Sequence, residues 1–260
     1  MSANQKPGYR RRGIYLLPNA FTTAALFAGF YGIVASMNGQ FEKAAVAIFI
    51  AMLLDGIDGR VARLTNTQSE FGAQYDSLAD MVSFGLAPAL IMYEWALASM
   101  AQMGGQWGRV GWLAAFIYAA CAAMRLARFN TQIGVADKRF FQGLPSPSAA
   151  AALVGMVWVC YDAGIKGEDV AILASILTLL IGILMVSNVL YYSFKEVNYK
   201  ERVPFIAILV IALILALASI DFPKVLFGSF MIYILSGPLL ALLRRIRKLG
   251  RRKSQQDEAG

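Results

Sequence analysis

Four aspartates with two helical spacings are the feature of the sequence most able to do chemistry. Asp55 and Asp58 are three residues apart, and Asp76 and Asp80 are four residues apart. In an α-helix, either spacing places both side chains on one face, so two facing helices can direct four carboxylates to one centre. Carboxylate oxygens favour hard divalent cations, so we expect Mg²⁺ or Mn²⁺, with Ca²⁺ able to substitute structurally. Two ions bridged by a shared carboxylate would suit displacement at phosphorus.

Histidine is absent from the chain. It is the commonest general base and transition-metal ligand, so carboxylates must carry any proton transfer or metal binding. An alternative is that the aspartates form salt bridges, or simply face water. The cations near enough in sequence or depth for such bridges are Arg60, Arg63, Arg125 and Arg128. We favour the metal site because a charge near the bilayer centre costs at least about 2.5 to 3.5 kcal/mol, and four together need compensating cations.

Small residues accompany the first aspartate pair. Gly56 and Gly59 flank these aspartates, and Ala62 lies about one turn further on. Residues without bulk allow a diphosphate or nucleotide to approach a helix backbone. Close helix packing is the alternative explanation for small residues in a membrane helix. Beside aligned carboxylates, we expect room for a ligand.

The aspartates belong to a longer motif that is specific. It reads Asp55, two residues, Asp58-Gly59, two residues, Ala62-Arg63, eight residues, Gly72, three residues, Asp76, three residues, Asp80. Without a gap, this motif resembles the signature of the CDP-alcohol phosphotransferases. The resemblance implies that Asp55, Asp58 and Asp76 chiefly bind metal. It also implies that Asp80 is the base that deprotonates the acceptor alcohol and can contact a second ion. The residues that it assigns to the CDP-lipid site are Gly59, Ala62, Arg63 and Gly72, to which we add Asn19 and Thr22 as candidates.

Further strings are similar to the phosphatidylserine synthase branch of that family rather than the phosphatidylglycerophosphate branch. They are IYLLPNAFTTAALFAGFYGI at 14–33, YDSLADMVSFGLAPA at 75–89, RLARFN at 125–130 and FFQGLPSPSAAA at 140–151. This resemblance implies transfer of a phosphatidyl group from CDP-diacylglycerol to L-serine, with release of CMP, by a homodimer. It says little about the chain after residue 152.

Polar residues at the same expected depth could bind the acceptor. Arg125 and Arg128 are three residues apart, so both can face one pocket, and a guanidinium can hold a phosphate or carboxylate at two points. Helix capping or headgroup anchoring is the alternative role for this pair. Ser83 and Asn130 are further hydrogen-bonding candidates. We expect all four to lie near the serine or phosphate groups.

The composition indicates the element type that must position these residues. Of the 260 residues, 58% are hydrophobic and only 15% are charged, with a mean hydropathy of +0.56. A helix needs about 20 apolar residues to cross a bilayer. We therefore predict an all-α, polytopic integral membrane bundle of about eight transmembrane helices. The predicted spans are 14–38, 41–63, 73–100, 109–130, 146–163, 168–192, 203–220 and 223–243.

Charge placement predicts the orientation. Under this layout all but four of the 24 Lys and Arg lie on one side, together with both termini, and the exceptions are Lys43, Arg109, Lys166 and Lys224. The positive-inside rule then places both termini and the active site in the cytoplasm, in a multi-pass protein of the cell inner membrane. We interpret the net charge of +8 as contact with anionic membrane lipids rather than nucleic acid.

The sequence divides into three parts. Residues 1–13 form a basic juxtamembrane segment, 14–243 the membrane domain, and 244–260 a basic cytoplasmic tail. We expect disorder in this tail, most clearly over 251–260, because it has almost no apolar content. Cys121 and Cys160 both fall inside predicted spans, where a small buried side chain is the expected role and no disulfide is needed.

Three rival functions stay open at the level of sequence. The same chemistry could use another acceptor, such as glycerol 3-phosphate, inositol phosphate or choline. An intramembrane acidic cluster could instead serve as the transport site of a cation transporter. A purely structural membrane protein would have no use for four costly acids.

Overall fold

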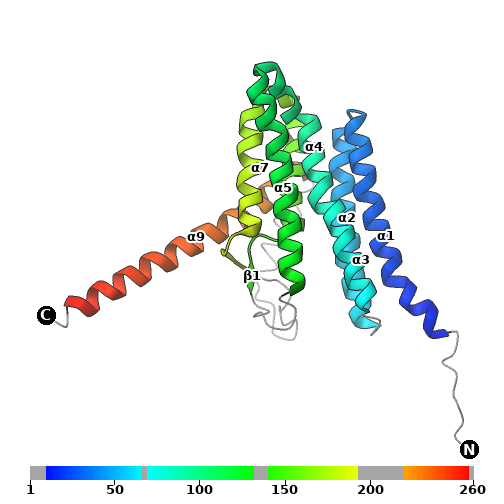
Figure 1. Ribbon diagram of the computed structural model, residues 1–260, viewed down its shortest axis with the longest axis horizontal. Helices are drawn as coiled ribbons and strands as arrows, with labels where there is room; N and C mark the ends of the chain where they lie inside the picture. Colours follow the sequence, from blue (N-terminus) through cyan, green and yellow to red (C-terminus); the bar gives the residue numbers. More distant parts are fainter. Residues whose placement is uncertain (1–9, 66–68, 132–139, 193–219, 258–260) are drawn as a thin grey trace, which may run out of the picture.

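The computed structural model describes residues 10–65, 69–131, 140–192 and 220–257. These residues form a bundle of helices with one short pair of strands (Figure 1). The first half of the chain contains α1 (Arg10–Met37), α2 (Phe41–Leu64), α3 (Glu70–Asp80), the π-helix η1 (Met81–Leu86), α4 (Ala87–Trp95), the 3₁₀-helix η2 (Leu97–Met103) and α5 (Gly105–Thr131). The second half contains β1 (Phe140–Gln142), α6 (Ser146–Asp162), the 3₁₀-helix η3 (Gly167–Val170), α7 (Ala171–Val186), β2 (Leu190–Tyr192) and α9 (Phe222–Asp257).

The predicted fold class is confirmed, but the count of eight spans is not. Among the residues that the structure describes, four helical stretches are long and apolar enough to cross a membrane alone, namely Pro18–Met37, Gly105–Thr131, Gly167–Val186 and Phe222–Leu243. The bent pair Glu70–Trp95 and Leu97–Met103 could provide a fifth. The predicted span 203–220 lies almost wholly outside the described residues. α2 and α6 coincide with predicted spans, but α2 carries several charges and α6 has only 17 residues.

α6 is the central helix of the bundle. Every residue from 149 to 158 on it is buried, beginning with four alanines at 149–152. Small side chains let neighbouring helices approach closely, and α6 contacts α2, α4, α7 and α9. Pro145 and Pro147 stand at the start of α6, where a missing backbone N–H is tolerated.

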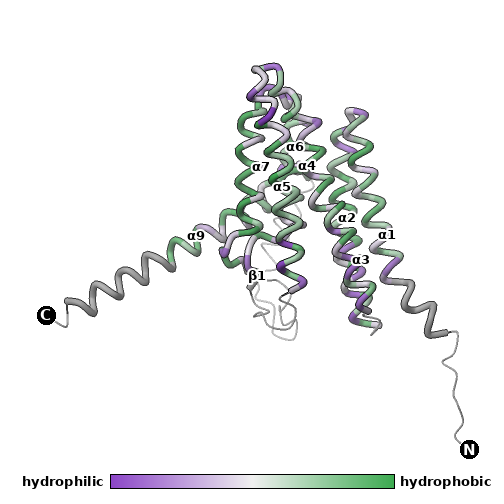
Figure 2. The backbone as a smooth tube through the Cα atoms, viewed as in Figure 1, coloured by the Kyte–Doolittle hydropathy of each residue, from purple (hydrophilic) through white to green (hydrophobic). Residues whose placement is uncertain are grey.

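The outer surface of the bundle is apolar in its middle. Large hydrophobic side chains such as Phe27, Phe116 and Leu173 are more than half exposed. Figure 2 shows that hydrophilic residues gather instead towards the ends of the helices, including the lower ends of α2, α3 and α5. This distribution is the one expected when lipid rather than water surrounds the middle of a bundle.

The third predicted span is interrupted, whereas the sequence indicated one helix over 73–100. The chain passes from α3 through η1 into α4 and then bends near Ala96. Pro88 explains the interruption, because proline has no N–H and its ring crowds the carbonyl four residues earlier. A π turn contains one extra residue, so the helix before it is rotated by about 100° relative to an uninterrupted α-helix.

Two further differences concern the points at which α7 and α9 end. α7 stops at Val186 and the chain continues into β2, which pairs antiparallel with β1 and places Phe141 opposite Tyr191. The sequence predicted helix through residue 192 and no strands. At the carboxyl end, α9 is helical through Asp257, in a range where the sequence predicts disorder. The Arg, Lys and Gln residues there have good helix propensity and continue a helix already formed.

Candidate active site

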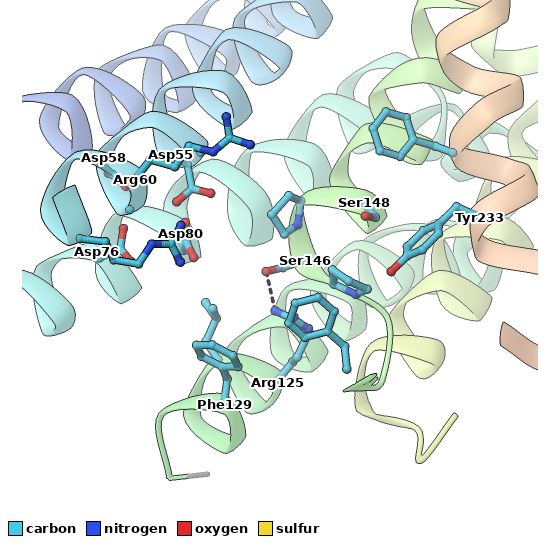
Figure 3. Close-up of a pocket in the computed structure, with 18 of the residues that line it drawn as sticks. Asp55, Asp58, Arg60, Asp76, Asp80, Arg125, Phe129, Ser146, Ser148 and Tyr233 are labelled. Atoms are coloured by element: carbon cyan, nitrogen blue, oxygen red, sulfur yellow. Dashed lines mark hydrogen bonds between the residues drawn. The ribbon is translucent and has the colours of Figure 1, made fainter. Parts of the chain in front are cut away.

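A single cavity of about 960 Å³ is lined by all four aspartates and by half of the site residues predicted from sequence. Its walls come from α2, α3, α5, the start of α6, and α9 (Figure 3). One wall carries the aspartates of α2 and α3, and the facing wall carries Arg125 with hydroxyl side chains. The cavity therefore presents an acidic side and a basic, hydroxyl-rich side.

Three of the four aspartates form a compact group. Asp55, Asp76 and Asp80 each offer a carboxylate oxygen within 4.8 Å of the others. Oxygens on opposite sides of one ion stand apart by twice the metal–oxygen distance, about 4.2 Å for Mg²⁺ and about 4.6 to 5.2 Å for Ca²⁺. The oxygen chemistry and the separations of the group both fit a hard divalent cation. We call these residues the aspartate triad.

Local structure explains why the triad forms. Asp55 lies on α2, while Asp76 and Asp80 occupy adjacent turns of α3 directly before the π turn. Both helices pack against α1, which thereby holds them together. Arg125 of α5 is near enough to act electrostatically on Asp80. Close like charges repel, so the group is stable only with a cation or shared protons nearby.

Asp58 takes a different position from the triad. It lines the same cavity but is only 5% exposed, and its Oδ2 accepts a 2.7 Å hydrogen bond from the Thr22 hydroxyl. Thr22 also lies 3.1 Å from the Pro18 carbonyl, one turn earlier on α1. The sequence predicted that four carboxylates share one centre. In the structure three carboxylates are grouped, and the fourth, Asp58, is hydrogen-bonded to Thr22 beside them.

The predicted CDP-lipid residues divide into two sets. Gly59 and Arg63 line the cavity, together with Gly56 and Arg60. A Cβ added at either glycine would meet nothing within 4 Å, so this stretch of α2 backbone faces open space. Ala62 is not among the lining residues.

Asn19 and Gly72 meet each other beside the cavity rather than in its lining. A Cβ on Gly72 would lie 3.5 Å from the Asn19 side-chain oxygen. The N–H of Gly72 donates to the Ser69 hydroxyl, which caps the start of α3. The first turn of α3 therefore lies close to Asn19 of α1.

Of the predicted acceptor residues, only Arg125 faces the cavity. Arg125 is 9% exposed, and its Nη1 donates to the Ser146 hydroxyl at 2.8 Å. Its Nε is buried and has no hydrogen-bond partner among the described residues. A buried guanidinium with donor capacity to spare is suited to an anionic group.

The other three acceptor candidates make contacts within the protein. Ser83 donates to the carbonyl of Ala25 on α1 at 3.1 Å. Asn130 donates to Ser77 at 2.9 Å, which connects α5 to α3. Arg128 donates to the last carbonyls of α7 and to Asn188, the capping role that the sequence left as its alternative. None of the three is among the residues that line the cavity.

Several lining residues were not predicted. Ser146 and Ser148 come from the first turn of α6, where they alternate with Pro145 and Pro147. Serine in a first helical turn beside proline was the available signal. Tyr233 comes from α9, in a stretch whose apolar composition gives no sign of a site. Figure 3 shows its hydroxyl directed from α9 into the cavity.

Comparison with known proteins supplies an independent line of evidence. The chain matches the CDP-alcohol phosphatidyltransferase family over residues 15–172. It is 37% identical over 221 residues to the CDP-diacylglycerol–serine O-phosphatidyltransferase of Helicobacter pylori (strain ATCC 700392 / 26695), covering 85% of this chain and 90% of that protein. The protein of the same name from Methanocaldococcus jannaschii is 35% identical over 189 residues, which cover 73% and 78% of the two chains.

A third relative of that name, from Mycobacterium bovis, is 41% identical over 155 residues, or 56% of this chain and 51% of the relative. The matched residues 15–172 contain the aspartate triad, Asp58, Arg125 and the serines of α6. Tyr233 lies outside them. The chain therefore belongs to the CDP-alcohol phosphatidyltransferase family of membrane transferases.

Proposed function

We propose that this chain transfers the phosphatidyl group of CDP-diacylglycerol to the hydroxyl of L-serine and releases CMP. The observation that carries this proposal is one cavity with the aspartate triad on one wall and the buried Arg125 on the other. Two of the relatives described above are named for that reaction, and their sequences match most of the length of this chain. The triad suits a diphosphate–metal complex, and the guanidinium suits an acceptor that carries a carboxylate.

We assign the divalent cation, Mg²⁺ or Mn²⁺, to Asp55, Asp76 and Asp80, with Asp58 beside them. When bound, the cation would neutralise charge on the diphosphate and on the departing CMP. Asp58 can contribute its second oxygen, because Thr22 occupies only Oδ2. Gly56 and Gly59 leave room for the diphosphate against α2, and Arg60 and Arg63 add positive charge on that side. A second ion is part of the proposal.

Asp80 acts as the base. Its carboxylate accepts the proton of the serine hydroxyl, the serine oxygen forms a bond to the lipid-side phosphorus, and the bond from that phosphorus to the CMP oxygen breaks. Position matters more than basicity here, because an ordinary aspartate is a weak base. Asp80 lies at the end of α3, where it belongs to the triad and is also acted on by Arg125.

The basic wall orients the acceptor. We propose that Arg125 receives the serine carboxylate, since its Nη1 is already fixed by Ser146 and its Nε is a spare donor. Ser148 and Tyr233 offer hydroxyl groups around the same space. An acceptor held there would have its hydroxyl facing the acidic wall.

We place the cavity on the cytoplasmic side of the inner membrane, with the diacylglycerol chains remaining in lipid. The distribution of Lys and Arg supports this orientation. The membrane domain is proposed to extend over 14–243, with short basic segments at 1–13 and 244–260. A homodimer is also part of the proposal, and the family resemblance supports it.

The test is an acceptor panel with purified protein. CDP-diacylglycerol and Mn²⁺ or Mg²⁺ are incubated with serine, glycerol 3-phosphate, inositol phosphate or choline, and CMP release and lipid product are measured. Serine-dependent CMP release with formation of phosphatidylserine is expected. Release with another acceptor would overturn the serine assignment. Divalent-cation flux into liposomes without CMP release would overturn the transferase assignment and favour a transporter.

A further inference from the structure

The π turn η1 connects the catalytic helix α3 to the buried helix α4. Asp80 is the last residue of α3, and η1 begins at Met81. The far side of the turn is fixed in the core, since Ala87, Ile91 and Met92 of α4 are fully buried. Any change in the turn must therefore move α3 rather than α4.

A hydrogen bond from another helix stabilises this turn. In a regular α-helix the carbonyl of Phe84 would accept from the N–H of residue 88, but residue 88 is proline and has none. The hydroxyl of Tyr118 on α5 donates to the Phe84 carbonyl at 3.0 Å. Both residues are 0% exposed, so no water can replace that donor. Tyr118 supplies the hydrogen bond that Pro88 removes.

The opposite side of the turn is held by α1. Ser83 donates to the carbonyl of Ala25, and a Cβ on Gly29 would lie only 2.8 Å from the Ser83 Cα. The two backbones are therefore in close contact there. The turn is therefore bonded to both α1 and α5. Tyr118 is the side chain that donates to its Phe84 carbonyl.

We propose that Tyr118 is a positioning residue that keeps Asp80 within the aspartate triad by stabilising the π turn. If the turn tightened to regular α-helix while α4 stayed in place, α3 would rotate by about 100°. Asp80 and Asp76 would then leave the side of α3 that faces Asp55. This inference rests on the proposed function for the role of the triad, but Tyr118, Phe84 and Pro88 lie outside the cavity lining.

The experiment measures Mn²⁺ binding directly, by electron paramagnetic resonance on the purified full-length protein in detergent, together with thermal unfolding. In Tyr118→Phe the ring remains and only the hydroxyl is lost. Residues that orient metal ligands typically contribute 10- to 100-fold to metal affinity, so we expect Mn²⁺ binding roughly tenfold weaker or more. The matched control is Tyr191→Phe, which also removes one buried hydroxyl bonded to a backbone carbonyl, that of Ile234. We expect it to bind Mn²⁺ as the wild type does.

Pro88→Ala tests whether the missing N–H of Pro88 is what maintains the π turn. The new N–H can donate to the Phe84 carbonyl, which favours regular helix, so we expect weaker Mn²⁺ binding in a folded protein. Adding Tyr118→Phe to Pro88→Ala should change the affinity little further, because the two variants act on one hydrogen-bonded carbonyl.

The outcomes separate this inference from the proposed function. A folded Tyr118→Phe protein with wild-type Mn²⁺ affinity overturns the inference alone. If that variant does not fold, wild-type affinity in Pro88→Ala overturns it instead. A wild-type protein that binds no Mn²⁺ overturns the metal site of the proposed function, and the inference falls with it.

Discussion

The hydroxyl of Thr22 on α1 lies 2.7 Å from Oδ2 of Asp58 on α2, and this hydrogen bond joins the first helix to the aspartate motif. Both residues are buried, at 4% and 5% exposure. Thr22 was predicted from sequence to be a residue of the CDP-lipid site. The structure shows it holding an aspartate of the cavity wall, so its effect on substrate would pass through Asp58.

Replacing Thr22 by valine keeps the shape of the side chain and removes the donor. Asp58 then loses a charge-assisted hydrogen bond in a buried setting, which costs about 1.5 to 3 kcal/mol. We expect the Mn²⁺ concentration for half-maximal CMP release to rise by roughly 10- to 100-fold. The control is Thr23→Val, an exposed neighbour whose hydroxyl contacts Asn19 and Tyr75. Equal Mn²⁺ requirements in the two variants would show that the hydrogen bond from Thr22 to Asp58 does not contribute to metal binding.

Replacing Asp80 by asparagine removes the proposed base with almost no change in size. We expect binding of CDP-diacylglycerol to remain close to normal while turnover falls by at least about 100-fold, because a positioned base contributes 10²- to 10⁴-fold. Lipid binding and single-turnover CMP release on the same preparation separate the two effects. Asp221→Asn is the control, since Asp221 lies near the surface and pairs with Lys224 outside the cavity. Near-normal turnover in Asp80→Asn would rule out the base assignment.

The elements and the acidic wall could be predicted because both are local properties of the chain. Apolar run length sets most of the helices, and the four-residue spacing of Asp76 and Asp80 sets their common face. Family resemblance supplied the division of roles among the aspartates. The structure then grouped these two residues with Asp55 within 4.8 Å, while Asp58 turned to Thr22.

The basic wall could not be predicted in the same way, because it depends on contacts between distant helices. Arg125 and Arg128 look equivalent in sequence, yet one donates to Ser146 in the cavity and the other to the end of α7. Helix rotation decides between them, and rotation is a property of packing. Tyr233 reaches the cavity only because α9 packs against α6. Pro88 was the only sequence signal for the π turn, and its effect also depends on the hydroxyl donor of Tyr118 on α5.

Removal of the metal should destabilise the protein. A ligand that binds only the folded state adds about 2.7 kcal/mol at 100 times its dissociation constant. We therefore expect chelation to lower the midpoint of thermal unfolding and Mn²⁺ to restore it. The paired variant Asp55→Asn with Asp76→Asn should show no response to Mn²⁺, whereas Asp221→Asn should respond as the wild type does. A full response in the paired variant would place the ion elsewhere.

The choice of acceptor should depend on Arg125. Replacement by lysine leaves one compact ammonium in place of the planar guanidinium that donates to Ser146 and has a spare Nε. Ethanolamine matches serine except for the carboxylate, so the ratio of kcat/KM for serine to that for ethanolamine isolates this contact. Because a hydrogen bond to a charged group contributes about 1.5 to 3 kcal/mol, we expect Arg125→Lys to lower that ratio by roughly 10- to 100-fold.

The matched control is Arg128→Lys, which alters the same residue type one helical turn away, where it caps α7. We expect its thermal stability to fall while its preference for serine over ethanolamine stays that of the wild type. The KM for CDP-diacylglycerol should change little in Arg125→Lys, since the diphosphate is assigned to the opposite wall. The opposite result, in which Arg128→Lys loses the preference for serine and Arg125→Lys keeps it, would contradict the assignment. The acceptor carboxylate would then have to lie near the end of α7, and the cavity wall built from Arg125 and Ser146 would hold some other part of the substrates.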